Sequence, residues 1–149
     1  MIPEIGIPEE QVQSITKNLA SILTSEFELY IKTLHAHWNV VDRSFYGLHK
    51  MFGKQYEEIY GIVDSVAERI RSLGELADVS GKYTASTNKL SGDIIPELLE
   101  SHEVLITELR EYIKEINQTE DFGTANFLTG IMEQHEKIAW MLRASFGKQ

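Results

Sequence analysis

Apolar residues recur at steps of three and four along most of this chain, which is the spacing of one face of an α-helix. The first run predicts a helix over about residues 9–40, and the second predicts a helix over about residues 45–73. A third run begins near Pro96, a residue suited to the first turn of a helix, and extends to about Ile116. The fourth ends near Gly147. The hydrophobic pattern therefore predicts an all-α protein with four helices.

Polar segments separate these runs. Residues 41–44 break the first run from the second, and residues 117–121 predict a turn that offers Thr119 or Asp121 as a helix cap. Residues 75–95 contain several glycines, serines and threonines and predict a long connection. A connection of that length can carry the chain from one end of a bundle to the other. We therefore expect residues 1–149 to form one four-helix bundle domain with a long crossover between its second and third helices.

The composition fits a single globular domain. The 149 residues are 42% hydrophobic and 25% charged. No apolar run approaches the roughly 20 residues needed to span a bilayer, and the N-terminal residues lack the basic start and apolar block of a signal peptide. The chain contains no cysteine, which excludes disulfides and thiolate metal sites. We expect a cytoplasmic protein that does not bind membranes.

The net charge of −9 narrows the set of partners. Contacts with nucleic-acid phosphates need clustered lysine and arginine, whereas the 14 basic residues here are scattered and form no basic tail. A surplus of carboxylates suits hard metal cations instead, although an acidic surface that binds nothing explains the same charge. The sequence therefore argues against DNA binding and leaves metal binding open.

Four side chains of metal-ligand type occur on the first two predicted helices. His37 ends the first helix and His49 lies early in the second, so a hairpin can bring them together. Asp64 and Glu68 lie one turn apart on the second helix and share a face. His49 and Asp64 are 15 residues apart, or about 22 Å along a continuous helix. Ligands must lie within about 2.0–2.6 Å of a metal ion. If the four residues serve one site, a second copy supplies half of it, with the second helices antiparallel about a two-fold axis.

Each of these residues also has an ordinary structural interpretation. An isolated histidine on a helix is more often packed or hydrogen-bonded than a ligand, and Trp38 can simply pack at a helix end. A di-iron centre within one chain is disfavoured, because bundles of that kind use Glu-x-x-His pairs and this sequence contains none. For His102 and His135, core or surface positions are favoured over metal sites.

Several segments of the chain resemble the Dps family, the mini-ferritins of bacteria. The resemblance covers nearly the whole chain and is carried by His37-Trp38-Asn39, Leu48-His49, residues 64–74 (D-S-V-A-E-R-I-R-S-L-G) and the C-terminal H-E-K-I-A-W-M-L-R-A. It implies a ferritin-like four-helix bundle that assembles as a dodecameric shell around a hollow mineral core.

The resemblance also implies a ferroxidase centre between two subunits, which oxidises Fe(II), usually with hydrogen peroxide, and so limits the production of hydroxyl radicals. His37 and His49 would be metal ligands from one chain, and Asp64 and Glu68 would be metal ligands from its neighbour. Trp38 would lie beside the metals and donate electrons to stray oxidant. The chain would then be an iron-binding oxidoreductase and a homo-oligomer.

One departure from the family lies at Gly53, one turn after His49, where the family places a carboxylate that helps to hold and bridge the irons. Glycine supplies no ligand and costs roughly 0.5–1 kcal/mol relative to alanine within a helix. Close approach of paired helices is the structural explanation for it, and Glu57 is a distant substitute ligand. We expect weaker or asymmetric metal binding, slower oxidation, or a single occupied iron position.

A second departure concerns iron entry. The segment E-D-F-G-T-A-N-F resembles the family's lining of a three-fold pore, with Asn126 where an aspartate often stands. Asparagine keeps the shape and loses the charge, which weakens the attraction for cations. Asp121 would still give the pore a negative potential. A solvated turn is the competing interpretation.

The sequence thus predicts iron sequestration and detoxification, with Fe(II) oxidised at inter-subunit centres and Fe(III) mineral stored in the shell. Two alternatives remain. In one, Gly53 marks a degraded centre, and the shell serves storage or scaffolding. In the other, the protein associates with the nucleoid and protects DNA, which the charge of −9 and the missing basic tail oppose.

Overall fold

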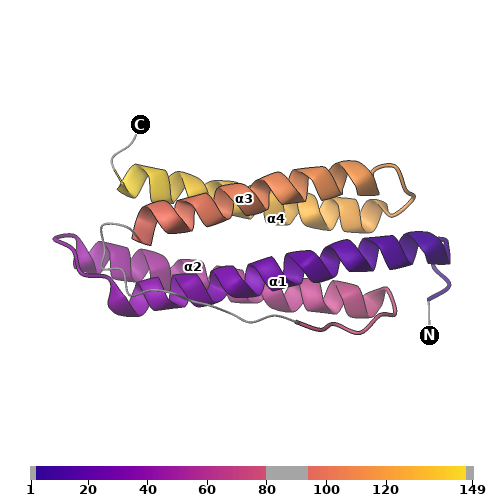
Figure 1. Cartoon of the computed structure of the whole chain (residues 1–149), viewed down its shortest axis with the longest axis horizontal. Helices are drawn as coiled ribbons and strands as arrows, with labels where there is room; N and C mark the ends of the chain where they lie inside the picture. The colour runs from indigo at the N-terminus through magenta and orange to yellow at the C-terminus, as the bar shows by residue number, and fades with distance from the viewer. Residues whose placement is uncertain (1–2, 80–93, 147–149) are drawn as a thin grey trace.

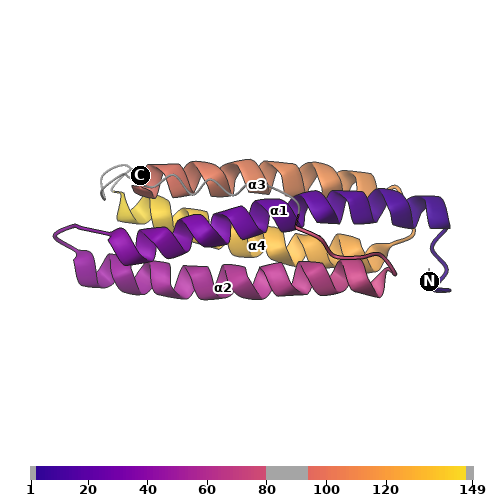
Figure 2. The same cartoon turned by 60° about the horizontal axis from the view of Figure 1, so that its bottom comes forward.

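The computed structural model describes residues 3–79 and 94–146. It confirms the four predicted helices: α1 (Glu9–Asn39), α2 (Phe45–Ser72), α3 (Ile94–Ile116) and α4 (Phe122–Ser145). All four run along the long axis of a bundle (Figure 1, Figure 2). α3 begins two residues before Pro96, which therefore lies in the first turn, where its missing N–H removes no intrahelical bond. None of the described helices is long and apolar enough to cross a membrane.

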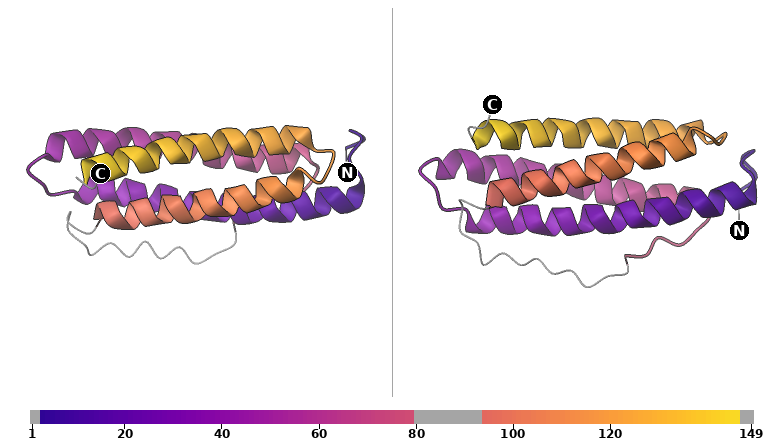
Figure 3. Two further views of the ribbon diagram at one scale, coloured as in Figure 1. Left: turned by 90° about the horizontal axis from the view of Figure 1, so that it is seen from above. Right: turned by 45° about the horizontal axis from the view of Figure 1, so that its top comes forward.

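The chain folds as two antiparallel helical hairpins. α1 and α2 form the first hairpin through residues 40–44, and α3 and α4 form the second through residues 117–121. Figure 3 shows the second hairpin lying along the first over most of its length. α2 ends and α3 begins at opposite ends of the bundle (Figure 1). The crossover predicted between them falls on residues 75–95, of which residues 80–93 lie outside the described part of the chain.

The apolar stripes of the sequence form the core between the hairpins. Phe52, Ile59, Val66 and Ile70 lie on one face of α2, and each is at most 1% exposed. Burial of such a side chain contributes about 1.5–3 kcal/mol relative to its exposure. The buried side chains that the other three helices bring to this core include Leu19, Ile22, Leu23, Leu98, Leu109, Leu128, Ile138 and Leu142.

Gly74 ends α2, as the sequence indicates. Its φ is +94°, a backbone angle that residues other than glycine rarely adopt. The N–H of Gly74 donates to the carbonyl of Arg71 at 3.0 Å, and the N–H of Glu75 donates to the carbonyl of Ile70 at 3.3 Å. These two bonds form a Schellman motif, which satisfies carbonyls that the end of a helix leaves without partners.

Candidate metal centre

His37 and His49 meet where α1 and α2 join. Their rings are nearly parallel, with centroids 3.9 Å apart and planes inclined by 20°. The Nδ1 of His37 lies 2.8 Å from the backbone oxygen of His49, and the Nδ1 of His49 lies 2.9 Å from the backbone oxygen of His37. The hairpin therefore brings together two histidines that are 12 residues apart in the sequence.

These reciprocal hydrogen bonds determine the tautomer of both rings. A backbone carbonyl only accepts, so the Nδ1 of each histidine carries the hydrogen and donates it. In the neutral ring the Nε2 atom then holds a lone pair, and neutral imidazole is the form that binds metals. Ligand histidines typically donate their other N–H to a carbonyl or a carboxylate in this way. Both His37 and His49 are thus prepared to bind a metal through Nε2.

Aromatic side chains flank the two imidazoles. Phe45 stacks on His49, with ring centroids 5.2 Å apart and planes inclined by 24°. Tyr56 meets His37 edge-on, with centroids 5.2 Å apart and an angle of 64°. Because each imidazole lies between another ring and a hydrogen-bonded carbonyl, its rotation is restricted. A fixed orientation favours metal binding, since little side-chain entropy remains to be lost.

Gly53 lies directly against His37. A Cβ atom on Gly53 would be 3.3 Å from Cε1 and 3.4 Å from Nδ1 of the His37 ring, which is closer than nearly all real Cβ contacts. The absence of a side chain therefore lets the His37 ring rest on the backbone of α2. The sequence shows only that this position has no side chain, whereas the structure shows that the His37 ring uses part of the space.

Asp64 and Glu68 lie further along α2, and both are exposed. They are one turn apart on one face, whereas Asp64 is 15 residues from His49 on the same helix. This separation corresponds to about 22 Å. The His37–His49 pair and the Asp64–Glu68 pair therefore lie far apart within one chain. Among the described residues, no three histidine, aspartate or glutamate side chains of the chain are arranged to hold a metal ion.

Trp38 follows His37 in α1 and points elsewhere. Its side chain is 60% exposed, and its ring packs on His35 with centroids 5.4 Å apart. Adjacent residues on a helix project in different directions, so Trp38 and His37 do not face each other. In one chain, the oxidisable side chain that contacts His37 is Tyr56 rather than Trp38. The predicted role of Trp38 as an electron donor stays a prediction.

The two predicted pore residues differ in their surroundings. Asp121 is 3% exposed, caps α4 by accepting from the N–H of Thr124 at 2.9 Å, and pairs with Arg69 of α2 at 2.9 Å. Its carboxylate therefore fixes the start of α4 against the end of α2, and the guanidinium balances its charge. Asn126 lies one turn further along α4 and is exposed. A pore between subunits stays a prediction for both residues.

A polar chain crosses the core of the bundle. The carboxylate of Glu26 on α1 accepts from Nε2–H of His135 on α4 at 2.8 Å. The Nδ1 of His135 lies 2.9 Å from the Nδ1 of His102 on α3. With neutral rings, His102 donates to His135, and His135 donates to Glu26. All three side chains are fully buried. Burial and the neighbouring His135 hold the pKa of His102 well below its usual value.

The sequence analysis placed His102 and His135 in the core or on the surface, and the structure places them in the core. It overlooked Glu26 and also Gln55 of α2, which is 1% exposed. A usable pattern was present, because Glu26, Gln55, His102 and His135 all occupy positions where the helical period calls for an apolar residue. Each helix therefore contributes at least one buried polar side chain to the core.

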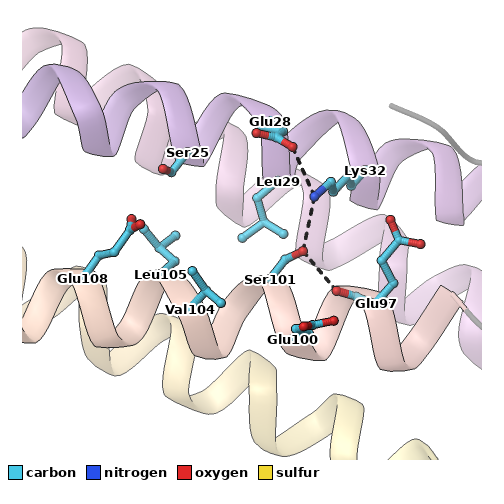
Figure 4. Close-up of a pocket in the computed structure, with 10 residues that line it drawn as sticks. All are labelled: Ser25, Glu28, Leu29, Lys32, Glu97, Glu100, Ser101, Val104, Leu105 and Glu108. Atoms are coloured by element: carbon cyan, nitrogen blue, oxygen red, sulfur yellow. Dashed lines mark hydrogen bonds and ion pairs between the residues drawn. The ribbon is translucent and has the colours of Figure 1, made fainter. Parts of the chain in front are cut away.

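An acidic groove of about 320 Å³ lies between α1 and α3, apart from His37 and His49 (Figure 4). The carboxylates that line it are Glu28, Glu97, Glu100 and Glu108. Among the lining residues Lys32 is the cation, and it pairs with Glu28 at 3.2 Å and donates to Ser101 at 3.4 Å. The excess of carboxylates gives this side of the bundle a negative potential, which attracts cations from solution.

Comparisons with known proteins agree with this architecture. A family model for the ferritin-like domain matches residues 16–148. The chain is 37% identical over 150 residues to an uncharacterized low temperature-induced protein of Nostoc sp., a match that covers 94% of this chain and 84% of that protein. It is 30% identical over 125 residues to the DNA protection during starvation protein of Brevibacillus brevis, covering 78% of this chain and 83% of that protein.

The fold is also similar to a solved structure, the Dps protein of Vibrio cholerae O1, described as a member of a broad superfamily of ferritin-like diiron-carboxylate proteins. The TM-score is 0.88 at 25% identity, and the match covers 96% of this chain and 95% of that one. The matches in sequence and in fold both extend over most of the chain. The protein therefore belongs to the Dps family of ferritin-like proteins.

Proposed function

We propose that this protein oxidises Fe(II) at centres shared between two subunits and stores the Fe(III) product as mineral inside a hollow dodecameric shell. The observation that carries the proposal is the His37–His49 pair, whose reciprocal hydrogen bonds through Nδ1 leave both Nε2 lone pairs available to a metal. The carboxylates Asp64 and Glu68 lie too far along the same helix to join this pair within one chain. Two antiparallel α2 helices bring the halves together.

Iron is the substrate of this reaction. Imidazole nitrogens and carboxylate oxygens form the mixed ligand set that iron accepts in both of its common oxidation states. Two Fe(II) ions each give one electron to one hydrogen peroxide molecule, its O–O bond breaks, and both oxygens reach the oxidation level of water. Because both electrons go to one peroxide, no hydroxyl radical is released. The chain supplies the ligands, their fixed orientation and the negative charge that gathers cations.

Entry of iron is the second part of the proposal. Asp121 and Asn126 lie at the start of α4, where we place the three-fold pore of the shell. Asp121 is largely neutralised by Arg69, and Asn126 is uncharged, so this pore attracts cations only weakly through these two side chains. We therefore expect iron uptake to depend strongly on ionic strength only if other carboxylates, such as Glu120, line the entrance.

A degraded centre is the alternative that a specific observation favours. Gly53 replaces a ligand that the family uses, and its space is partly taken by the His37 ring. In that case the shell would store or scaffold without oxidising iron. The net charge of −9 gives no support to DNA binding.

Stopped-flow mixing of anaerobic Fe(II)-loaded protein with peroxide tests the oxidation. We expect a rate well above the buffer control in the wild type, its loss in His49→Ala, and its retention in His35→Ala, which changes a histidine outside the pair. A wild-type rate equal to the buffer control would exclude the ferroxidase function and leave storage.

Mixed assemblies test whether the centre is shared. His49→Ala and Asp64→Ala should each be inactive alone. In a dimer of the two variants, one of the two centres receives His49 from one chain and Asp64 from the other, both intact. Co-assembly should therefore restore part of the activity. If the mixture stays as inactive as its components, the two residues do not belong to one shared centre.

A further inference from the structure

The outer face of α2 carries both halves of the proposed centre on one line of side chains. His49, Gly53, Tyr60 and Asp64 follow one another at steps of four, seven and four residues, and such steps keep residues on one face of a helix. Tyr60 is large, aromatic and 59% exposed in the single chain. Gly53 has no side chain. The line therefore has a projection and a gap that are about 10.5 Å apart along the helix.

The shared centre determines how two such lines face each other. Asp64 and Glu68 of the partner subunit can both reach His49 only if the turn that holds them lies opposite His49. One turn further along α2 is Gly53, and the partner helix runs the other way. The turn from Asp64 back to Tyr60 of the partner subunit therefore faces Gly53. Asp64 of the partner subunit is directed toward the metal, which leaves Tyr60 of the partner subunit to occupy the gap at Gly53.

Resting on the proposed function, we propose that Tyr60 of the partner subunit fills the space beside Gly53 and supplies its phenol oxygen to the iron bound by His37 and His49. The position that a Cβ of Gly53 would take is 3.3 Å from Cε1 and 3.4 Å from Nδ1 of His37, so the imidazole already takes part of this space. A side chain that covers Gly53 from across the interface thus lies beside Cε1 of this imidazole, one bond from Nε2. The phenol replaces the missing carboxylate.

The chemistry of this ligand is balanced and specific. When the phenol binds Fe(III), its O–H bond breaks, the proton passes to solvent, and an oxygen–iron bond forms. Phenolate is an established ligand of Fe(III) in proteins. Fe(II) carries less charge and polarises the phenol less, so the O–H bond stays intact. The tyrosine therefore favours the oxidised metal, as a ligand at a site of oxidation should.

Packing supports the same arrangement. Two helices in contact lie about 8–10 Å apart, and a large residue opposite a glycine fits this separation well. Within its own chain the Tyr60 ring rests on Tyr30, with centroids 5.7 Å apart and planes inclined by 50°. That contact restricts the ring. The 59% of the side chain that stays exposed is available for burial by the partner.

The first test is spectroscopic and uses the assembled full-length protein with Fe(III) as the probe. We expect a visible phenolate-to-iron charge-transfer band and tyrosine vibrations in its resonance Raman spectrum. Tyr60→Phe should lose both, and Tyr112→Phe, which removes a hydroxyl from α3, should keep both. Gly53→Asp should weaken the band, because the carboxylate competes for the same place. Persistence of the band in Tyr60→Phe would overturn the assignment.

The second test needs no metal and uses the absence of cysteine from the chain. A disulfide joins Cα atoms about 4.4–6.8 Å apart, whereas positions 53 and 60 of one helix are about 10.5 Å apart. Oxidation of the Gly53→Cys, Tyr60→Cys double variant should therefore give disulfide-linked dimers. Gly53→Cys alone and Tyr60→Cys alone should stay unlinked, and a mixture of the two should give linked pairs. Absence of the link in the double variant would overturn the proposed pairing.

The outcomes also separate this proposal from the proposed function. A wild-type protein that oxidises Fe(II) with peroxide but shows no phenolate band would contradict the role of Tyr60 and leave the shared centre intact. A wild-type protein that neither binds nor oxidises iron would contradict both.

Discussion

Glu26 and His135 form a hydrogen bond of 2.8 Å in a part of the core where neither side chain is exposed. The bond joins α1 of the first hairpin to α4 of the second, and His102 of α3 extends it. Among the described residues, Oε2 of Glu26 and Nε2 of His102 have no hydrogen-bond partner. Each end of this series of three hydrogen-bonded side chains therefore has unused bonding capacity. Polar pairs of this kind add little net stability, but losing one partner is costly.

We predict that Glu26→Ala lowers the free energy of unfolding by about 1–3 kcal/mol, because it leaves the N–H of His135 buried without its acceptor. The matched control is Arg143→Ala, which breaks the 2.8 Å pair with Glu103 on the surface, where the two side chains are 44% and 51% exposed. That loss should stay below about 1 kcal/mol. Urea unfolding at one protein concentration measures both. Equal losses in the two variants would contradict the importance of the buried bond.

The pKa of His102 predicts how stability depends on pH. Burial lowers this pKa in the folded chain, so near the usual value of 6.5 the unfolded chain binds the proton more readily. The contribution of His102 to the free energy of unfolding is therefore complete above its pKa in the unfolded chain. It is lost as the pH falls toward the pKa of His102 in the folded chain. For one proton the slope reaches about 1.4 kcal/mol per pH unit.

Unfolding by urea at about pH 7.5 and about pH 5.5, on either side of the ordinary histidine pKa, measures this dependence. His102→Gln should flatten the profile relative to the wild type, because glutamine does not titrate. His35→Gln, at a partly exposed position on α1, should leave the profile close to that of the wild type. If both variants keep the wild-type slope, His102 is not the group responsible.

Gly53→Ala should separate stability from metal binding. Alanine favours the helix by roughly 0.5–1 kcal/mol over glycine, but its Cβ would crowd the His37 ring at 3.3 Å. We expect little net change in the free energy of unfolding and a weaker affinity for Fe(II), since the displaced ring is one of the ligands that we propose. Gly130→Ala on α4, where an added Cβ meets nothing within 4 Å, should gain stability and keep its affinity.

Anaerobic calorimetric titration with Fe(II), together with urea unfolding, gives both quantities for each variant. An unchanged affinity in Gly53→Ala would mean that the His37 ring does not need its present position against α2.

Asp121→Ala should cost about 0.5–2 kcal/mol through the loss of the α4 cap alone. Arg69→Ala keeps the cap but leaves a carboxylate that is 3% exposed without its cation, so we expect a loss at least as large. The double variant should cost less than the sum, because both changes remove the same ion pair. Additive losses, measured by urea unfolding, would show that the two side chains act independently.

The helices were predictable because each buries one stripe of side chains, and the period of that stripe is visible in the sequence. The stop at Gly74 was predictable for a related reason, since its positive φ favours glycine. The start of α3 was placed two residues late, at Pro96, because proline is tolerated throughout the first turn and not only at its first position.

The meeting of the two candidate histidines was predictable, and the contacts they make were not. The spacing of His37 and His49 across a hairpin indicated that they meet, but their hydrogen bonds go to backbone oxygens, which every residue has. The contact between Gly53 and the His37 ring depends on how closely α1 approaches α2. Glu26 was overlooked because a single carboxylate within an apolar stripe hardly changes its period.

The exchange of hydrogen bonds between His37 and His49 makes the two imidazoles interdependent. Neither ring can turn away without releasing the backbone carbonyl of the other, so thermal opening of the hairpin end removes both nitrogens together. A lengthened or shortened loop at residues 40–44 would shift both at the same time. Affinity for iron should then behave as a cooperative unit, either present with two nitrogens or absent, rather than declining through a one-histidine intermediate.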